Sequence, residues 1–386
     1  MTDGASILIS GARAPVALGI GRAFEAAGFD VHFVDSVPSL MTRWSGFGRA
    51  RLHRVPPPKS EFGKFRADFR ALVDEIDPLL IVPTCEEVFY LSQAAVLDGF
   101  ERRLFAPSLP ILRRLHSKFE FAELARDCGL EPPLTWRATS ADDLQSHRSR
   151  SRDLVFKPEF SRFGAETLIR PAGAEVTKLN AGPDKAWVVQ EFVEGEEVCV
   201  WSAARDGRLL ALAGYLPKWR FGGASSYFLR DDDPALVDLC RTLAASVGMT
   251  GQMSIDCIRT KGGKLRPIEC NPRAVSGANL FGGDARLALA LINGPSGLLM
   301  PELQACHVGP AFWSAAIARL VRTGGLIEAV RDAKRSSGVL TDNGGPRAAV
   351  GGLLDFARFA LKGAIASRSS TQESTADIEW NGEPIQ

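Results

Sequence analysis

The feature that most limits the fold of this chain is the alternation of strand and helix patterns in its first hundred residues. Short apolar runs at 7–10, 31–35 and 79–83 alternate with helical apolar spacing at 16–27 and 62–76. Strands separated by helices of this length form βαβ units, so we expect a parallel sheet. Right-handed crossovers place the loops at 11–15 and 83–87 at the carboxyl edge of that sheet, where ligands bind. Arg13 and Glu86 lie in these loops and are therefore candidate substrate contacts.

The glycine-rich stretch at 11–21 is compatible with three interpretations. It reads G-A-R-A-P-V-A-L-G-I-G, which is not the G-x-G-x-x-G fingerprint of dinucleotide-binding proteins. A tight strand-to-helix turn, with Pro15 at the entry of the helix, is the favoured interpretation. A contact between Arg13 and a small substrate is the second, and a dinucleotide site, as in a dehydrogenase, is the third.

A different pattern begins near residue 105. We expect a helix at 111–129 and then strands at 154–157, 167–170, 187–191, 197–203, 209–215, 254–259 and 265–270. Short turns such as 205–207 and 260–263 indicate that most of these strands are antiparallel. Helical patterns return after residue 282, and the Ser/Thr-rich segment 367–377 is typical of a flexible tail.

Composition argues against several classes of partner. The chain has 46 Lys and Arg residues against 45 Asp and Glu residues, so no basic excess points to nucleic acid or to an anionic membrane. Seven scattered cysteines without a C-x-x-C pair, and only five histidines, favour reduced core cysteines in a cytoplasmic protein over a structural zinc site.

Neither end of the sequence predicts a membrane segment. Asp3 and the lack of a basic leader region argue against a signal peptide. The apolar run at 348–366 is interrupted by three charged residues at helical spacing. This pattern favours an amphipathic helix against a partner or a subunit over a membrane span.

The strongest chemical signal is a set of oxygen-bearing side chains on two neighbouring strands. Glu269 and Asn271 are two residues apart, so on a strand they face the same side. The turn at 260–263 folds Asp256 back beside them as a hairpin. Two carboxylates and one amide oxygen on a rigid sheet suit Mg²⁺ that is also held by nucleotide phosphates. Three ordinary residues at a sheet edge are the alternative interpretation.

Two further segments indicate nucleotide binding. Lys157 ends a β-rich run and can act as a point charge for a phosphate, while the loop amides around Ser161 and Gly164 can cradle phosphate oxygens. The connector after strand 187–191 exposes backbone that can read an adenine edge, and the Glu197 carboxylate can accept ribose hydroxyls. The alternatives are a surface lysine before a turn and an acidic turn kept in water.

The order of these signals, with Ser117-Lys118 before them, resembles the ATP-grasp superfamily. Its members include D-alanine–D-alanine ligase, biotin carboxylase, carbamoyl-phosphate synthase and bacterial amino-acid and dipeptide ligases. The resemblance covers roughly residues 1–310. It implies an α/β and α+β fold: a parallel α/β domain at 1–108, an ATP-grasp domain at 109–309 whose two subdomains meet near 190–196, and a helical C-terminal region with a flexible tail at 310–386.

The resemblance also implies roles for individual residues. Lys118 and Lys157 would hold the nucleotide phosphates, and Asp256, Glu269 and Asn271 would hold one or two Mg²⁺ ions, with Mn²⁺ as a substitute. The implied adenine and ribose contacts are Gln190, Glu191, Phe192, Val193 and Glu197. The implied catalytic cations are Arg273 and, in a loop at 217–227, Lys218 and Arg220. The implied further substrate contacts are Gly223, Ser225, Ser276 and Gly277.

The activity that the resemblance implies is ATP-dependent joining of a carboxylic acid and an amine through an acyl phosphate, with ADP and phosphate as products. The substrates would be small molecules, amino acids among them, and a homodimer is compatible with the chain. An ATP-grasp enzyme with another acceptor for its acyl or carbamoyl phosphate, and a nucleotide sensor without turnover, are the alternatives. One departure matters: D-alanine ligase has an arginine two residues before the first metal aspartate, where this chain has Ser254.

Overall fold

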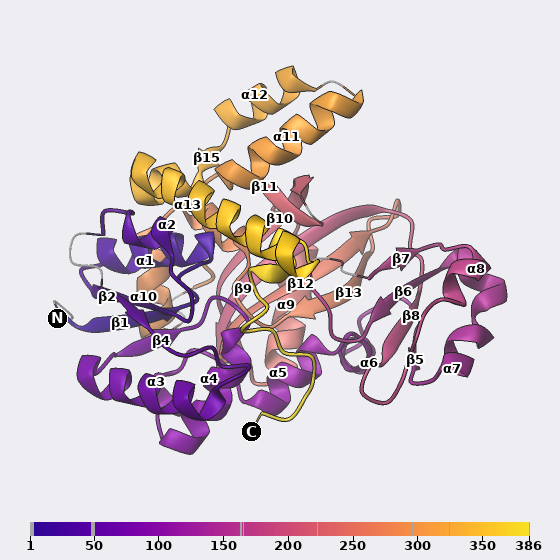
Figure 1. Cartoon of the computed structure of the whole chain (residues 1–386), viewed down its shortest axis with the longest axis horizontal. Helices are drawn as coiled ribbons and strands as arrows, with labels where there is room; N and C mark the ends of the chain where they lie inside the picture. Colours follow the sequence, from indigo (N-terminus) through magenta and orange to yellow (C-terminus); the bar gives the residue numbers. More distant parts are fainter. Residues whose placement is uncertain are drawn as a thin grey trace.

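The chain builds three β-sheets one after another along the sequence (Figure 1). The computed structural model describes residues 4–47, 51–162, 164, 166–221, 223–294, 297–323 and 325–385. Helices cover the first sheet and part of the third, and a helical region follows the last long strand. The mixed α/β and α+β fold class expected from the sequence is confirmed.

The first sheet is parallel, with the strand order β3-β2-β1-β4. Its strands are β1 (Ser6–Ser10), β2 (Asp30–Asp35), β3 (Arg51–Arg54) and β4 (Leu80–Val82). The helices around it are α1 (Pro15–Ala26), α2 (Leu40–Arg43), α3 (Phe62–Ile76) and α4 (Glu87–Asp98). The three apolar residues at the centre of β1 are fully buried, as a strand covered on both faces requires. The expected βαβ arrangement is confirmed, and it brings the loops after β1 and β4 to one edge.

The helix expected at 111–129 is instead two helices, α5 (Leu109–His116) and α6 (Lys118–Asp127). Ser117 between them has an extended backbone, and its side chain accepts a hydrogen bond from the Glu120 N–H group. Serine is a favoured N-cap because its oxygen satisfies an otherwise unpaired donor of the first turn. The break therefore places Lys118 at the first position of α6.

The second sheet is antiparallel, with the order β5-β8-β6-β7, and forms the small lobe at the right of Figure 1. Its strands are β5 (Thr135–Ala138), β6 (Leu154–Pro158), β7 (Leu168–Ile169) and β8 (Trp187–Glu191). Its helices are α7 (Ala141–Ser146), the 3₁₀ helix η2 (Arg148–Asp153) and α8 (Gly173–Val176). The lobe has its own small core, with Phe156 and Trp187 among its buried residues.

The third sheet has the order β13-β12-β9-β10-β11-β14-β15. Its strands are β9 (Glu196–Arg205), β10 (Arg208–Phe221), β11 (Ala224–Arg230), β12 (Gly251–Arg259), β13 (Leu265–Asn271), β14 (Ala305–His307) and β15 (Ser337–Gly338). The helices between them are α9 (Pro234–Ser246), η3 (Ser276–Phe281) and α10 (Ala285–Asn293).

The loop expected at 217–227 is wrong, because β10 and β11 form an antiparallel hairpin across this segment. Lys218 lies opposite Tyr227, and Arg220 lies opposite Ser225. Trp219 between them has a φ angle of 53°, so the ladder is interrupted at that residue. Trp219 and Tyr227 are nevertheless buried among C-terminal residues, and this tertiary packing explains why a segment rich in glycine and serine extends a strand.

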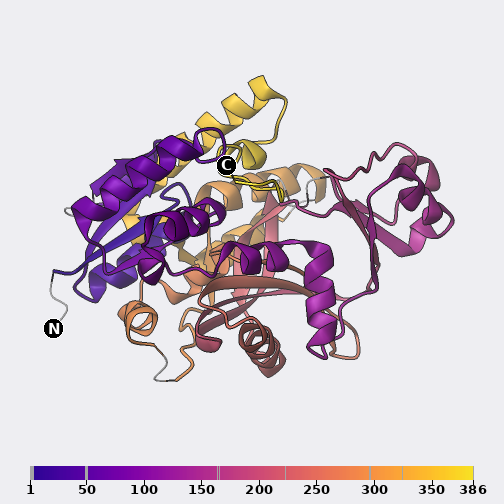
Figure 2. The ribbon, with the colours of Figure 1, turned by 90° about the horizontal axis from the view of Figure 1, so that it is seen from below.

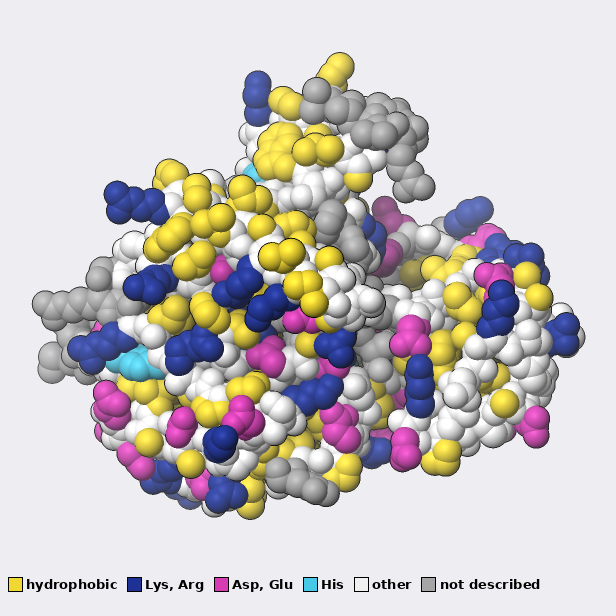
Figure 3. Space-filling model, viewed as in Figure 1, with side chains coloured by type: hydrophobic (Ala, Val, Ile, Leu, Met, Phe, Trp, Pro, Cys, Tyr) yellow, Lys and Arg dark blue, Asp and Glu magenta, His cyan; other side chains and the backbone are white. Residues whose placement is uncertain are grey.

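The C-terminal helices are α11 (Gly309–Thr323), α12 (Leu326–Lys334), α13 (Val339–Ala366) and α14 (Ser370–Glu373). Helix α13 is kinked at Gly345, which has a φ angle of 72° and precedes Pro346. Apolar side chains gather on the surface of α13 in Figure 3, and the exposed ones are Val350, Leu353, Leu354, Leu361 and Ile365. Within the described residues, no helix has the length and apolar character that crossing a membrane requires.

The C-terminal segment is not the free tail that its composition predicted. It runs between the N-terminal α/β elements and the small lobe in both Figure 1 and Figure 2. Trp380 is 2 % exposed, and its ring stacks on Phe89 at a centroid distance of 4.8 Å and meets Phe160 edge-on. The Ser/Thr-rich stretch has no apolar pattern of its own, so its order depends on the anchor that follows it.

Replacing this anchor should release the C-terminal segment. We expect Trp380→Ala to lower the free energy of unfolding by about 3 kcal/mol or to expose the segment to proteases, because a large buried ring is lost. Thermal unfolding and limited proteolysis with mass analysis of the C-terminal fragments would measure both effects. Trp313→Ala is the matched control, since that ring is 39 % exposed. Equal behaviour of the two variants would contradict the docking.

Candidate active site

A cavity of about 570 Å³ lies where the three sheets meet. It is lined by residues of the first sheet's loops, the small lobe, the third sheet and the C-terminal segment. Most residues predicted to bind nucleotide, metal or substrate line it: Arg13, Glu86, Lys157, Gly164, Gln190, Glu191, Phe192, Val193, Glu197, Arg220, Gly223, Ser225, Asp256, Glu269, Asn271, Arg273 and Ser276. The structure therefore brings together residues spread over 263 positions of sequence, from Arg13 to Ser276.

Two of the acidic residues that line the cavity lie opposite each other on a strand pair. Asp256 on β12 lies opposite Glu269 on β13, and Ser254 lies opposite Asn271. Burial and the neighbouring Glu269 charge raise the pKa of Asp256 to about 7. Burial also raises the pKa of Glu269, but the ammonium groups of Lys118 and Lys157 outweigh it and hold the pKa below its usual range.

Two buried lysines approach Glu269 from different elements. The Lys157 Nζ atom, at the end of β6, lies 3.9 Å from the Glu269 carboxylate and donates to the Ile268 carbonyl at 3.2 Å. The Lys118 Nζ atom, in the first turn of α6, lies 3.8 Å from the same carboxylate and donates to the Ser161 carbonyl at 2.9 Å. Burial lowers the pKa of both ammonium groups, that of Lys157 to about 8.

The donor set at Asp256, Glu269 and Asn271 fits a hard divalent cation that is shared with another oxygen ligand. Two carboxylates and an amide supply oxygen donors, and a cation between them would relieve the repulsion that raises the Asp256 pKa. Across the described ranges, no group of three or more His, Cys, Asp or Glu side chains could hold a metal ion without other donors. Such a cation would complete its coordination with oxygens from water or from a bound ligand.

The connector after β8 is shaped like a strand that turns away from its sheet. The N–H groups of Glu191 and Phe192 donate to the carbonyls of Leu134 and Asp153. No described residue accepts a hydrogen bond from the Val193 N–H group, so this donor is available to a ligand. The Gln190 side chain is buried and donates to the Thr135 hydroxyl, which makes it a support of the connector.

Three charged groups connect the far end of the cavity to neighbouring loops. Glu86 is 1 % exposed, accepts a hydrogen bond of 2.6 Å from the Arg162 Nε atom and lies 3.5 Å from an Arg273 Nη atom. Arg273 also donates weakly to the Asn271 side chain at 3.4 Å. Arg273 is therefore held beside the acidic pair by a carboxylate of the first domain.

Some predicted residues lie outside the cavity lining or are already engaged. Lys218 pairs with Asp332 at 2.7 Å and with Glu328 at 3.1 Å, both on α12, so its ammonium group is turned to the C-terminal helices. Arg220 forms an ion pair with Glu197, the expected ribose contact. Lys118 and Ser161 stand behind the lining, and Gly277 lies so close to the Tyr215 ring that a Cβ atom would come within 2.1 Å of it.

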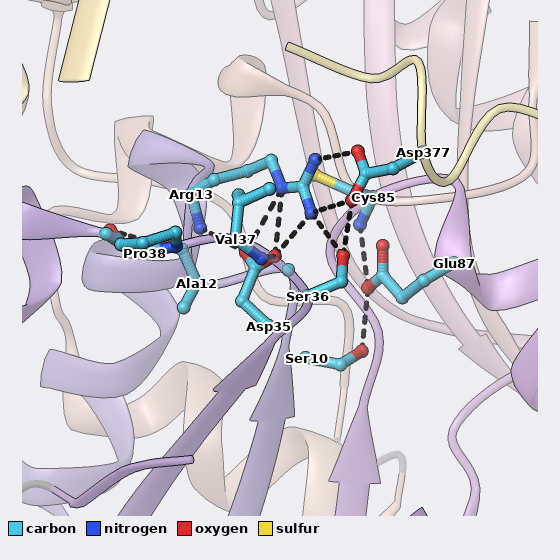
Figure 4. Close-up of polar contacts among 12 residues, drawn as sticks. Ser10, Ala12, Arg13, Asp35, Ser36, Val37, Pro38, Cys85, Glu87 and Asp377 are labelled. Carbon is cyan, nitrogen blue, oxygen red and sulfur yellow. Dashed lines mark hydrogen bonds and ion pairs between the residues drawn. The ribbon is translucent and has the colours of Figure 1, made fainter. Parts of the chain in front are cut away.

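Arg13 contacts protein groups on every side, as Figure 4 shows. Its guanidinium donates to Asp35, to the Ser36 hydroxyl and to Asp377, and it pairs with each of the two carboxylates at 2.5 Å. Burial lowers the pKa of Arg13, but these carboxylates outweigh it and hold the pKa above its ordinary value. The guanidinium is thus a structural anchor at the cavity edge.

Sequence reasoning missed two groups of lining residues. Apolar side chains beside the connector include Val155, Ile169, Ile258 and Ile268, and they were read only as strand residues. Thr371, Ser374 and Thr375 also line the cavity, although their segment was predicted to be a tail. The alternating faces of the strands could have revealed the first group, whereas no local pattern marks the second.

Comparison with known proteins identifies the central part of the chain. Residues 115–277 match the family model of an ATP-grasp domain. No curated protein sequence matches the chain. The resemblance seen in the sequence is thereby confirmed for this part of the chain, which contains an ATP-grasp domain.

Solved structures with this fold extend the likeness beyond the matched region. An L-amino acid ligase from Bacillus licheniformis is 16 % identical, with 72 % of this chain and 69 % of that chain covered and a TM-score of 0.55. An N5-carboxyaminoimidazole synthase from Aspergillus clavatus, in complex with ADP and 5-aminoimidazole ribonucleotide, is 12 % identical, with 78 % and 81 % covered and a TM-score of 0.61. A biotin carboxylase domain dimer from Hydrogenobacter thermophilus, with MgADP and bicarbonate, is 12 % identical, with 75 % and 70 % covered and a TM-score of 0.59. At these identities the likeness is one of fold.

The buried lysines provide a direct test of the site. We expect Lys157→Met to weaken ATP and ADP binding by tenfold or more, because a charge-assisted hydrogen bond contributes about 1.5–3 kcal/mol. Titration calorimetry without acid or amine would measure the affinity. Lys264→Met is the control, since Lys264 is exposed and pairs with Glu131. Unchanged affinity in a folded Lys157→Met protein would contradict the phosphate site.

Proposed function

We propose that this chain is an ATP-dependent ligase that joins a carboxylic acid to an amine through an acyl phosphate and releases ADP and phosphate. The observation that carries the proposal is the convergence of Lys118 and Lys157 on Glu269, the strand partner of Asp256, where Lys157 and both carboxylates line a single cavity. Two buried cations beside an acidic pair suit the charged end of a nucleotide with its divalent cation. Solved structures of this fold in complex with ADP or MgADP support the assignment.

The rest of the nucleotide fits the part of the cavity inside the small lobe. The apolar side chains of Val155, Ile169 and Ile268 can enclose an adenine ring there, and the free Val193 N–H can donate to its edge. The Glu197 carboxylate would accept the ribose hydroxyls after nucleotide binding separates it from Arg220. In this assignment the connector after β8 leaves the sheet so that its backbone can contact the adenine.

The chemistry follows from the poor reactivity of a carboxylate. An amine cannot displace oxide, so the γ-phosphoryl group of ATP is first transferred to a carboxylate oxygen, with ADP as the leaving group. The amine then attacks the carbonyl carbon, the bond from that carbon to the phosphate oxygen breaks, and the nitrogen loses a proton. Bound Mg²⁺ would offset charge on the phosphate oxygens during the transfer.

The residues of this chain hold the reactants and exclude water. Lys118 and Lys157 offset phosphate charge in a site with little access to solvent, where such charges act strongly. Arg273 stands beside the acidic pair and is proposed to orient the reacting carboxylate. It would replace the arginine that D-alanine ligase has at the position of Ser254. The Ser254 hydroxyl is buried and donates to the Val200 carbonyl, so it supplies no charge.

Product formation separates this proposal from its alternatives. We expect ADP release to require an acid and an amine together, and the product mass to equal the sum of both minus water. A panel of carboxylic acids and amines, read by ADP release and mass spectrometry, would find the active pair. ADP release with an acid and another acceptor would support the acyl-phosphate alternative, and nucleotide binding without ADP across the panel would support a sensor.

The acidic pair gives a second prediction. Glu269→Gln keeps the shape of the side chain and removes its charge, so we expect ADP release in Mg²⁺ or Mn²⁺ to fall by about a hundredfold or more. Glu196→Gln is the matched control, because Glu196 lies at the start of β9 and is exposed. Full turnover in the Glu269→Gln protein would show that Glu269 does not hold the cation.

A further inference from the structure

The C-terminal segment takes part in the walls of the proposed active site. Thr371, Ser374 and Thr375 line the same cavity as Glu269 and Arg273. Ser374 lies beside the loop after β1, because Arg13 of that loop donates to its carbonyl. Arg273, which the proposed function assigns to the acid substrate, lies 3.5 Å from Glu86 in the loop after β4.

One end of this wall is fixed by Arg13. Its Nη1 atom donates to the Ser374 carbonyl at 2.9 Å, and its two Nη atoms bind the two oxygens of Asp377 at 2.5 and 2.9 Å (Figure 4). Because the same guanidinium binds Asp35 at the end of β2, residues 374–377 are tied to the first sheet. Arg13 is 4 % exposed, so solvent does not screen these pairs.

The segment that follows the wall residues is fixed by Arg162, from the loop after β6. Its guanidinium donates to the Trp380 carbonyl at 2.8 Å and pairs with Glu379 at 3.0 Å, while its Nε atom binds Glu86. The segment 374–380 is therefore held at both ends by buried arginines. A pocket wall held in this way discriminates between substrates by shape, because it cannot move aside at low cost.

The charges at this end of the cavity are already paired. Arg13 pairs with Asp35 and Asp377, and Glu86 pairs with Arg162. Among the described residues the Glu86 Oε2 atom has no hydrogen-bond partner, but it has almost no exposed surface and so offers no place for a substrate cation. Burying an unpaired charge here would cost free energy, whereas small apolar or hydroxyl groups lose little.

We propose that residues 371–375 are a specificity wall and that the acid substrate carries a small, uncharged side chain. The proposal rests on the ligase function proposed above, and it adds the class of acid. Thr371, Ser374 and Thr375 line the cavity together with the apolar side chains of Pro15, Val16 and Val275. The Ser374 and Thr375 hydroxyls donate to the Thr371 and Gln372 carbonyls, so this wall presents small, uncharged groups. Arg273 is left to bind the carboxylate.

The test compares acids at a constant amine and saturating ATP. The panel contains acids with small uncharged, large apolar, anionic and cationic side chains, and we expect kcat/KM to be at least tenfold higher for the first class. Ser374→Leu enlarges the wall, so kcat/KM for the larger accepted acids should fall tenfold or more while the KM for ATP stays within twofold. Ser370→Leu is the control, because Ser370 lies on α14 and does not line the cavity. A preference for charged acids, or the same acid profile in both variants, would overturn the proposal.

Two additions keep the test decisive. Thr371→Val preserves volume and removes a hydroxyl, so it serves if Ser374→Leu does not fold, and we expect it to raise KM only for acids with a polar side chain. An unchanged KM for all acids in Thr371→Val would count against the wall. Hydrogen exchange of residues 371–377, measured with ADP and the acids of the panel, needs no turnover. If small uncharged acids protect these residues in a protein that never releases ADP, the result would support the wall and refute the ligase function. If the protein is active but no acid protects these residues, the result would refute the wall.

Discussion

The rest of the structure depends on the balance of charge around Glu269. Asp256 and Glu269 lie opposite each other on β12 and β13, where two buried carboxylates repel. Lys118 and Lys157 offset this repulsion, but they come from α6 and β6, outside the third sheet. The acidic pair is therefore stable only when α6 and the small lobe pack against that sheet. The same packing closes the cavity in which a nucleotide would bind.

A second set of charges connects parts of the chain that are far apart in sequence. Arg13 joins β2 to the C-terminal segment, and Arg162 joins the loop after β6 to the same segment and to Glu86. Breaking a buried pair leaves an uncompensated charge, which is strongly destabilising. These contacts make the last residues part of the cavity wall, and they leave Arg273 as the cation nearest the acidic pair at that end of the cavity.

Much of the fold could be predicted because its signals are local. The βαβ pattern of the first sheet and most strands of the other two follow from apolar periodicity, and the fold class followed from the resemblance carried by the order of the motifs. The helix at 111–129 was predicted as one because a capping serine inside an apolar pattern is a weak signal, and Ser117 divides it. The loop at 217–227 was wrong because Trp219 and Tyr227 pack against C-terminal residues that no local window contains. The pairing of Lys218 with Asp332 on α12 was missed because it also joins residues that are far apart in the sequence.

The sequence by itself determined which candidate site residues share a face. Spacing by two along a strand puts Glu269 and Asn271 on one side, and a hairpin turn returns Asp256 to them; both effects are local geometry. Only the tertiary structure decided that Arg13 would bind Asp35 and Asp377, and that Thr371, Ser374 and Thr375 would line the cavity. Contacts between residues more than 350 positions apart depend on how all three sheets pack, and no periodicity in the chain encodes them.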